Sequence, residues 1–228
     1  MDLLGIQKTL ERMEKILAKV SILGIGPGSR DYLLNITEEK IKEADILIGG
    51  SRALSLFSDL NKETVEITGQ LKKVKEFIAT NYQDKKIAVM VSGDPGLFSL
   101  MNYLKREFEE DIFEVIPGIS SLQLAAARLK MRWDDLEIVS LHGSPINDQM
   151  LELVRAKSKV GFLTDQNSSP DQIAKILIEN NIKNKKAAVC ENLSYSNENL
   201  IKGGLEKIKD QKYSDLNVMV IYDEELRI

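Results

Sequence analysis

The chain has 228 residues, of which 43% are hydrophobic and 29% are charged, and its formal net charge is −4. Such a chain can bury a substantial core, and without a basic excess it lacks the electrostatic signature of a nucleic-acid-binding protein. Cys190 and His142 are the only cysteine and histidine, which excludes an internal disulfide and a Cys/His metal cluster. No apolar run approaches the roughly 18 residues of a membrane span, so we expect a cytoplasmic protein without membrane contact.

Residues 1–19 precede the first predicted strand. Their apolar side chains recur at three- and four-residue steps, at Leu3, Ile6, Leu10, Met13 and Leu17. This spacing predicts an amphipathic helix. Asp2 stands where a secretory signal would carry positive charge, so the segment is not a signal peptide. The helix would pack on the main domain or on a partner subunit, unless translation begins at Met13.

The apolar segment at residues 20–25 predicts a buried strand, and it runs into the glycine-rich sequence G-I-G-P-G-S-R. Glycine permits a sharp turn and a close approach to a ligand, and ligands bind at the carboxyl ends of strands in open α/β sheets. The turn departs from a dinucleotide fingerprint, because Ser29 replaces the third glycine and the next predicted strand ends in Gly49 instead of an acid. Alone, it is equally compatible with a ligand site and with a tight turn that binds nothing.

The first half continues as an alternation of strands and helices. Strands are predicted at residues 46–48, 64–67, 86–92 and 112–116, and helices at residues 37–44, 51–57, 71–82, 97–108 and 119–129. Thr37 is the expected N-cap of its helix. Three of the strands end in glycine-containing turns, at residues 24–28, 93–96 and 117–118. A parallel sheet would place these turns on one rim, which favours a binding site there.

The second half repeats the alternation. Strands are predicted at residues 137–141, 160–164, 187–190 and 217–222, and helices at residues 148–156 and 171–180. A loop through Tyr195 and a turn at Gly203 and Gly204 precede the last strand, which we expect at an antiparallel edge. Residues 132–134 are the predicted domain junction. The expected architecture is therefore two α/β domains, at residues 20–132 and 133–228, with a cleft between them; the family resemblance described next implies that this cleft holds a cofactor.

Together these motifs resemble the tetrapyrrole methylases. In the first half, the resemblance rests on the motifs G-I-G-P-G-S-R-D-Y-L-L, S-G-D-P-G-L-F and I-P-G-I-S-S-L-Q-L-A. In the second half, W-D-D, V-S-L-H-G-S, F-L-T-D and V-C-E-N-L-S-Y are similar to the branch that methylates carbon 5 of the macrocycle. The resemblance covers residues 20 to about 223. It implies a homodimer that transfers a methyl group from S-adenosylmethionine (SAM) to cobalt-precorrin-7 or precorrin-7 in cobalamin biosynthesis, with a separate carbon-15 methylase/decarboxylase as a possible partner.

The resemblance also assigns candidate binding residues by motif position. The expected SAM contacts are Pro27, Ser92, Gly93, Asp94, Ser120, Ser121, Leu163, Thr164, Glu191, Asn192 and Leu193. Some of these residues also have an ordinary structural explanation. Asp94 could start a turn or cap a helix, and Ser120 and Ser121 could be N-caps.

No catalytic residue is assigned, because an enamine-like carbon is already nucleophilic and positioning alone can lower a barrier by ~7–11 kcal/mol. His142 is the candidate acid/base and a candidate substrate contact. Arg30, Arg128 and Arg132 are the other candidate substrate contacts, since a guanidinium binds carboxylates in a bidentate manner. Each of these arginines could instead belong to a solvated basic face.

Other functions are compatible with parts of the pattern. Another member of the same family could methylate a different macrocycle carbon, ribosomal RNA or a diphthine precursor. A nicotinamide-dependent oxidoreductase would need the third glycine and the ribose-binding acid that this sequence lacks. A non-catalytic binding module is compatible with the absence of a catalytic dyad, and turnover of SAM would exclude it.

Overall fold

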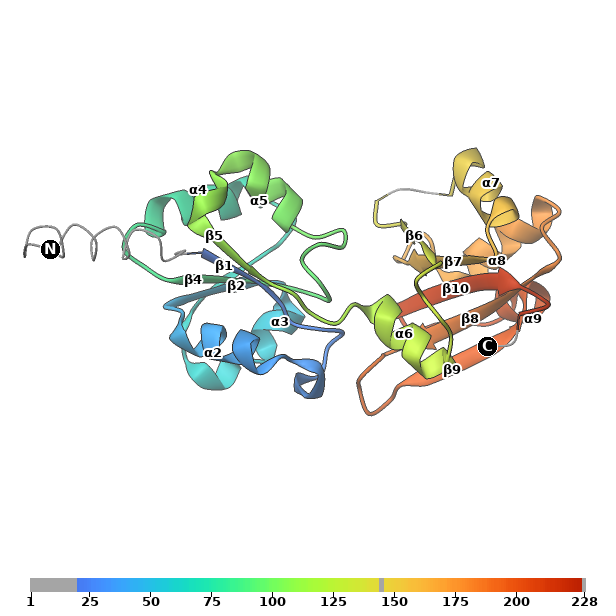
Figure 1. Ribbon diagram of the computed structural model, residues 1–228, viewed down its shortest axis with the longest axis horizontal. Coiled ribbons are helices and arrows are strands. Elements are labelled where there is room, and N and C mark those ends of the chain that lie inside the picture. The colour runs from blue at the N-terminus through green and yellow to red at the C-terminus, as the bar shows by residue number, and fades with distance from the viewer. Residues whose placement is uncertain (1–19, 144–145, 227–228) are drawn as a thin grey trace, which may run out of the picture. The chain divides into compact units, whose positions relative to one another are not determined.

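The structure is a computed structural model that describes residues 20–143 and 146–226. The chain divides into two compact units, of which the first ends at Ser120 and the second begins at Ser121 (Figure 1). The division falls before the predicted boundary at Arg132, because helix α6 (Ser121–Leu129) packs on the second sheet. A Cβ atom on Gly161 of that sheet would lie 3.0 Å from Leu122 Cδ2. The amphipathic helix predicted at residues 1–19 lies outside the described residues.

The first unit contains a five-stranded sheet in which every strand is parallel to its neighbours. Its strands are β1 (Val20–Gly24), β2 (Ile46–Gly49), β3 (Glu63–Glu66), β4 (Ile87–Val91) and β5 (Phe113–Ile116), in the order β3-β2-β4-β1-β5. Strand β4 is buried along its whole length, as its unbroken apolar sequence predicts. Because all strands run the same way, the turns that follow β4, β1 and β5 emerge side by side on one rim.

Helices cover both faces of this sheet, as Figure 1 shows. Helices α4 (Leu71–Asn81) and α5 (Met101–Glu107) pack on one face, and α2 (Asn35–Glu43) and α3 (Ser51–Ser55) pack on the other. Short 3₁₀ turns lie at Arg30–Tyr32, Ser58–Leu60 and Glu110–Ile112.

Helix α2 begins earlier than the sequence predicts. Its N-cap is Leu34, which makes no side-chain capping bond, so the prediction of Thr37 as N-cap is wrong. Thr37 is instead fully buried within the helix, and its hydroxyl has no hydrogen-bond partner among the described residues. Helix α5, in contrast, begins later than predicted, because residues 97–100 form turns.

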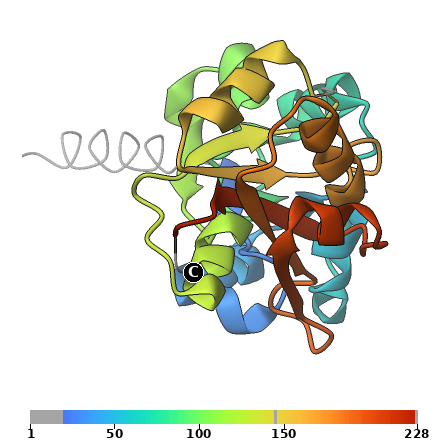
Figure 2. The ribbon, with the colours of Figure 1, turned by 90° about the vertical axis from the view of Figure 1, so that its right-hand side faces the viewer.

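The second unit contains a mixed sheet in the order β6-β7-β10-β8-β9. Its strands are β6 (Glu137–Ser140), β7 (Lys159–Leu163), β8 (Lys185–Glu191), β9 (Asn199–Gly204) and β10 (Asn217–Asp223). Strand β10 is antiparallel, as predicted, but it lies inside the sheet between β7 and β8 and not at an edge (Figure 2). The edge is formed by β9, where the sequence suggested only a loop and a glycine turn.

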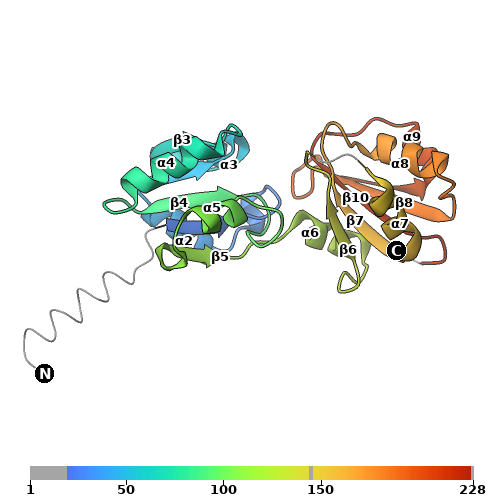
Figure 3. The same ribbon diagram turned by 90° about the horizontal axis from the view of Figure 1, so that it is seen from above.

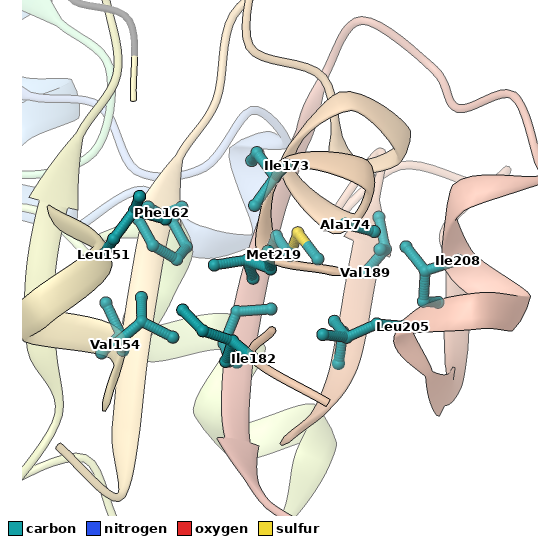
Figure 4. Close-up of a cluster of buried hydrophobic side chains, with 14 of the residues drawn as sticks. Leu151, Val154, Phe162, Ile173, Ala174, Ile182, Val189, Leu205, Ile208 and Met219 are labelled. Carbon is teal, nitrogen blue, oxygen red and sulfur yellow. The ribbon is translucent and has the colours of Figure 1, made fainter. Parts of the chain in front are cut away.

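Helices α7 (Asp148–Ala156), α8 (Pro170–Glu179) and α9 (Leu205–Lys209) cover one face of this sheet, with α8 beside α9 (Figure 3). Side chains from these helices meet Phe162, Val189 and Met219 of the strands in one continuous apolar cluster (Figure 4). The alternate residues of the strands face the other way, where α6 lies. The sheet is therefore covered on both faces.

Candidate functional site

Three turns of the first unit interlock at the carboxyl ends of β1, β4 and β5. Gly26 and Gly93 exchange backbone hydrogen bonds, with N···O distances of 3.3 Å and 2.8 Å. A Cβ atom on Gly118 would lie 2.2 Å from the Gly93 carbonyl oxygen and 2.7 Å from the carbonyl carbon of Gly24. Such distances leave no room for a side chain, which explains glycine at these positions. We call these turns, residues 25–28, 92–96 and 117–120, the first-unit rim.

The Asp94 carboxylate links two of the turns. One oxygen accepts the backbone N–H of Gly96 at 2.7 Å, and the other accepts the N–H of Gly118 at 3.0 Å. The turn after β4 is thereby fastened to the turn after β5. Asp94 thus has the structural role that the sequence left open, and its carboxylate is already engaged by protein amides.

The other predicted SAM contacts of the first half take different positions. Ser92 is exposed at the end of β4, and Pro27 is half-buried in the turn after β1. Ser120 is buried at the last position of the first unit. Ser121 is the first residue of α6 and belongs to the second unit. The first-unit rim therefore contains all of these residues except Ser121.

The candidate residues of the second unit gather along one edge of its sheet. Strands β6, β7 and β8 run in the same direction, so their carboxyl ends share an edge with the start of β10. Leu163 pairs with Ser140, and Glu191 pairs with Asn217. We call residues 140–143, 163–165 and 191–193 the second-unit edge. It brings together the predicted residues His142, Leu163, Thr164, Glu191, Asn192 and Leu193.

The polar side chains of this edge are largely bonded to the protein. The Thr164 hydroxyl lies 2.8 Å from the carbonyl oxygen of Asn217. The buried carboxylate of Glu191 accepts hydrogen bonds from the Asn199 amide, at 2.9 Å, and from the backbone N–H of Ser214. The Ser214 hydroxyl in turn lies 2.9 Å from Asn192 Oδ1. These hydrogen bonds tie the ends of β7 and β8 to the segment that leads into β10.

His142 is exposed, and its Nδ1 lies 3.4 Å from the Ser140 hydroxyl. The turn that follows it is held by Asp165, whose carboxylate accepts the backbone N–H of Gly143 at 3.1 Å. This bond, with those from the N–H groups of Asn167 and Ser168, lowers the pKa of Asp165 although burial opposes the shift. Sequence reasoning missed Asp165, although it is the last residue of the F-L-T-D motif at a strand end.

The three candidate arginines are each paired with a carboxylate. Arg30 lies 2.7 Å from Asp59 and 4.8 Å from the centre of the Phe57 ring. Arg128 of α6 pairs with Glu198 at 2.5 Å, and Arg132 pairs with Asp134 at 2.5 Å. Arg30 belongs to the first unit and the other two to the second. A substrate carboxylate would therefore compete with an existing ion pair at each position.

The described residues contain no group of three or more His, Cys, Asp or Glu side chains that could hold a metal ion. Cys190 is fully buried on β8, and burial raises the pKa of its thiol to about 12. It therefore acts as a small buried apolar side chain. Within the described residues no helix is long and apolar enough to cross a membrane.

The sequence of these two α/β units matches a known family. The sequence profile of the Tetrapyrrole (Corrin/Porphyrin) Methylases matches residues 19–209. The chain belongs to the tetrapyrrole methylases. A relative from Methanocaldococcus jannaschii, named probable cobalt-precorrin-7 C(5)-methyltransferase, is 38% identical over 90% of this chain and 99% of its own. The cobalt-precorrin-7 C(5)-methyltransferase of Salmonella typhimurium is 28% identical over the same shares.

Solved structures of tetrapyrrole methylases share the fold. The uroporphyrin-III C-methyltransferase from Thermus thermophilus, in complex with S-adenosylhomocysteine, superposes with a TM-score of 0.74. The match covers 89% of this chain and 96% of that chain, at 19% sequence identity. At this identity the likeness establishes the fold alone.

Proposed function

We propose that this chain is a SAM-dependent C-methyltransferase that adds a methyl group to carbon 5 of cobalt-precorrin-7 in cobalamin biosynthesis. The observation that carries the proposal is the 38% identity to the Methanocaldococcus jannaschii relative, which extends over 99% of that protein. The name of the Salmonella typhimurium relative gives the same reaction. The cobalt ion belongs to the macrocycle and not to the protein. Metal-free precorrin-7 is therefore the second candidate substrate.

The first-unit rim fits a ligand such as SAM. SAM carries a sulfonium cation, an amino-acid zwitterion and an adenosine, and none of these groups needs the lysine of a phosphate loop. At Gly24 and Gly118 the turns pack backbone against backbone, which brings their peptide groups together at the carboxyl ends of the strands. The exposed Ser92 adds a hydroxyl group. When bound, SAM supplies a methyl group on a positively charged sulfur.

The proposed SAM contacts are those assigned from the motifs. They are Pro27, Ser92, Gly93, Asp94, Ser120, Ser121, Leu163, Thr164, Glu191, Asn192 and Leu193. We assign Asp94, Thr164 and Glu191 a shaping role through their bonds to neighbouring backbone groups. Positioning by these groups is the main contribution expected from the protein, since the acceptor carbon is itself nucleophilic.

His142 is proposed as a substrate contact and as the candidate group for proton transfer. Its exposure and its weak contact with Ser140 leave the ring accessible. Arg30, Arg128 and Arg132 are proposed to meet the peripheral carboxylates of the macrocycle by exchanging their present partners. Because each already has an ion pair, substitution of one arginine should weaken substrate binding only modestly.

We further propose that the protein is a homodimer and that methylation at carbon 15 requires a separate methylase/decarboxylase. The names of both curated relatives mention carbon 5 alone, and the matches span 99% of each. Light scattering at tens of micromolar tests the dimer. A monomer at that concentration would refute the assembly and leave the proposed chemistry unaffected.

The decisive experiment is incubation of the purified protein with SAM and either cobalt-precorrin-7 or precorrin-7. Mass spectrometry should show one added methyl group, and NMR should place it at carbon 5. S-adenosylhomocysteine should also raise the melting temperature, because a ligand that binds only the folded state stabilises it. Methylation at a different carbon would identify a different member of the family. If no corrinoid is methylated, the proposed function is wrong.

A further inference from the structure

Phe98 has an unusual backbone conformation and an unusual exposure. Its φ angle is +47°, in the left-handed region that bulky side chains avoid. Its side chain is also the most exposed of the large hydrophobic residues in the described part of the chain, at 58%. Of the other non-glycine residues with positive φ in residues 20–143 and 146–226, three are asparagines, which tolerate this region. Phe98 is the single aromatic residue among them.

The turn that carries Phe98 is well ordered by hydrogen bonds. The N–H of Leu97 donates to the carbonyl oxygen of Asp94 at 3.1 Å, and the N–H of Met101 donates to the Ser99 hydroxyl at 3.1 Å. The Ser99 hydroxyl donates to the carbonyl oxygen of Pro95, which is itself buried. The strained conformation is therefore imposed by the turn. A strained residue that the surrounding structure holds in place is typical of ligand clamps.

Burial in the first unit does not explain the phenyl ring. The ring contacts of the described residues join Tyr82, Phe108 and Phe113 to one another and Arg30 to Phe57. Phe98 takes part in none of them. Glycine would adopt the same φ angle without strain. The positive φ angle and the 58% exposure of Phe98 are both unfavourable for an aromatic side chain, and no ring contact of the described residues accompanies them.

The position of Phe98 points to the acceptor of the methyl group. It directly continues the turn after β4, which belongs to the first-unit rim and contains the proposed SAM contacts Ser92, Gly93 and Asp94. Between Ser92 and Met101 the only charged residue is Asp94, and both of its oxygens accept backbone N–H groups. The turn that carries Phe98 therefore contributes no other charged side chain, which suits the flat conjugated face of a macrocycle better than its carboxylate rim.

We propose that the Phe98 ring packs against the conjugated face of the tetrapyrrole and is a specificity-determining substrate contact. This inference rests on the proposed function, since it names the group that meets the acceptor in the same reaction. Phe98 would contribute little to SAM binding, because backbone groups and the Ser92 hydroxyl serve that purpose. The ring would favour a planar macrocycle over smaller acceptors.

The test compares Phe98→Gly, Phe98→Leu and Phe98→Trp with the wild type. Phe98→Gly should keep or raise the melting temperature, because it removes the strain at φ +47°. It should raise KM for cobalt-precorrin-7 about tenfold, the size of one aromatic stacking contact. The Kd for S-adenosylhomocysteine, measured by calorimetry, should stay at the wild-type value. The KM of Phe98→Leu should lie between the values for the wild type and Phe98→Gly. The KM of Phe98→Trp should stay close to that of the wild type.

The matched control is Trp133→Leu, which removes an exposed aromatic side chain of the second unit. It should leave KM unchanged, in contrast to Phe98→Leu. A wild-type KM in Phe98→Gly would refute the substrate contact. A parallel rise in the Kd for S-adenosylhomocysteine would show that Phe98 acts on the SAM turn instead. A drop in the melting temperature of Phe98→Gly would show that the ring packs on the protein. If the wild type methylates no corrinoid, both the proposed function and this inference are wrong. If the wild type is active and the KM of Phe98→Gly is unchanged, only this inference is wrong.

Discussion

Replacing Asp94 by alanine tests whether its carboxylate holds the first-unit rim together. The substitution removes hydrogen bonds from the backbone N–H groups of Gly96 and Gly118. A hydrogen bond to a charged group contributes about 1.5–3 kcal/mol, and the lower end applies here because Asp94 is only half-buried. Water can replace the bond to the exposed Gly96, so the expected loss of unfolding free energy is about 2 kcal/mol. For a chain of this size that lowers the melting temperature by about 4–8 °C.

Thermal and urea unfolding followed by circular dichroism would measure the change. Asp84→Ala is the matched control, because Asp84 is exposed and its side chain makes no hydrogen bond with the described part of the chain. Asp94→Asn keeps one acceptor oxygen and should lose about half as much stability. The stabilisation of Asp94→Ala by S-adenosylhomocysteine should also be smaller than that of the wild type. If Asp94→Ala is as stable as Asp84→Ala, the carboxylate does not hold the turns together.

Three further predictions concern single side chains. Thr37→Val should raise the unfolding free energy by about 1 kcal/mol in urea titration, because it removes a buried hydroxyl without a described partner; a loss of stability would show that the hydroxyl is satisfied. Cys190 should not react with a thiol reagent at about pH 8 until the protein is unfolded, since its thiol is buried and its pKa is about 12; rapid labelling of the folded protein would contradict this. Burial raises the pKa of Glu198, but the hydrogen bonds from Arg128 and the N–H of Ser194 outweigh it, so the pKa is lowered from 4.5 in the folded state. The ionised carboxylate should therefore stabilise the fold above about pH 4.5, and this stabilisation should disappear as the pH falls. Glu198→Gln should make the unfolding free energy depend less on pH between about pH 5 and about pH 3.

The regular elements were predictable where a single local pattern decided them. The apolar run of β4 and the amphipathic pattern of α7 gave their positions to within a residue or two. Strand β9 was not predictable, because two glycines end it and only Leu200 and Ile201 are apolar. Its formation depends on pairing with β8, which is a tertiary effect. The central place of β10 likewise depends on a long-range pairing that local sequence does not encode.

For the candidate site, the positions of the residues were predictable from the sequence, but their hydrogen-bond and ion-pair partners were not. Motifs placed residues at strand ends, and the parallel direction of the strands was enough to predict that they share an edge. The partners of the side chains were not predictable. The bond from Gly118 to Asp94 crosses two loops, and Arg128 meets Glu198 from another element. The conformation of Phe98 also depends on the hydrogen bonds of its turn, so it could not be inferred from the sequence.

The place of β10 also has a consequence for synthesis on the ribosome. The first sheet uses only strands that end by Ile116, so all of its pairs are available early in translation. The second sheet cannot join β7 to β8 until Asn217–Asp223 has emerged, because β10 forms the ladder with both. Until then, two apolar strand edges stay unpaired and open to association with other chains. A premature stop codon shortly before Asn217 should therefore yield an aggregating product in which the first sheet has every one of its strands.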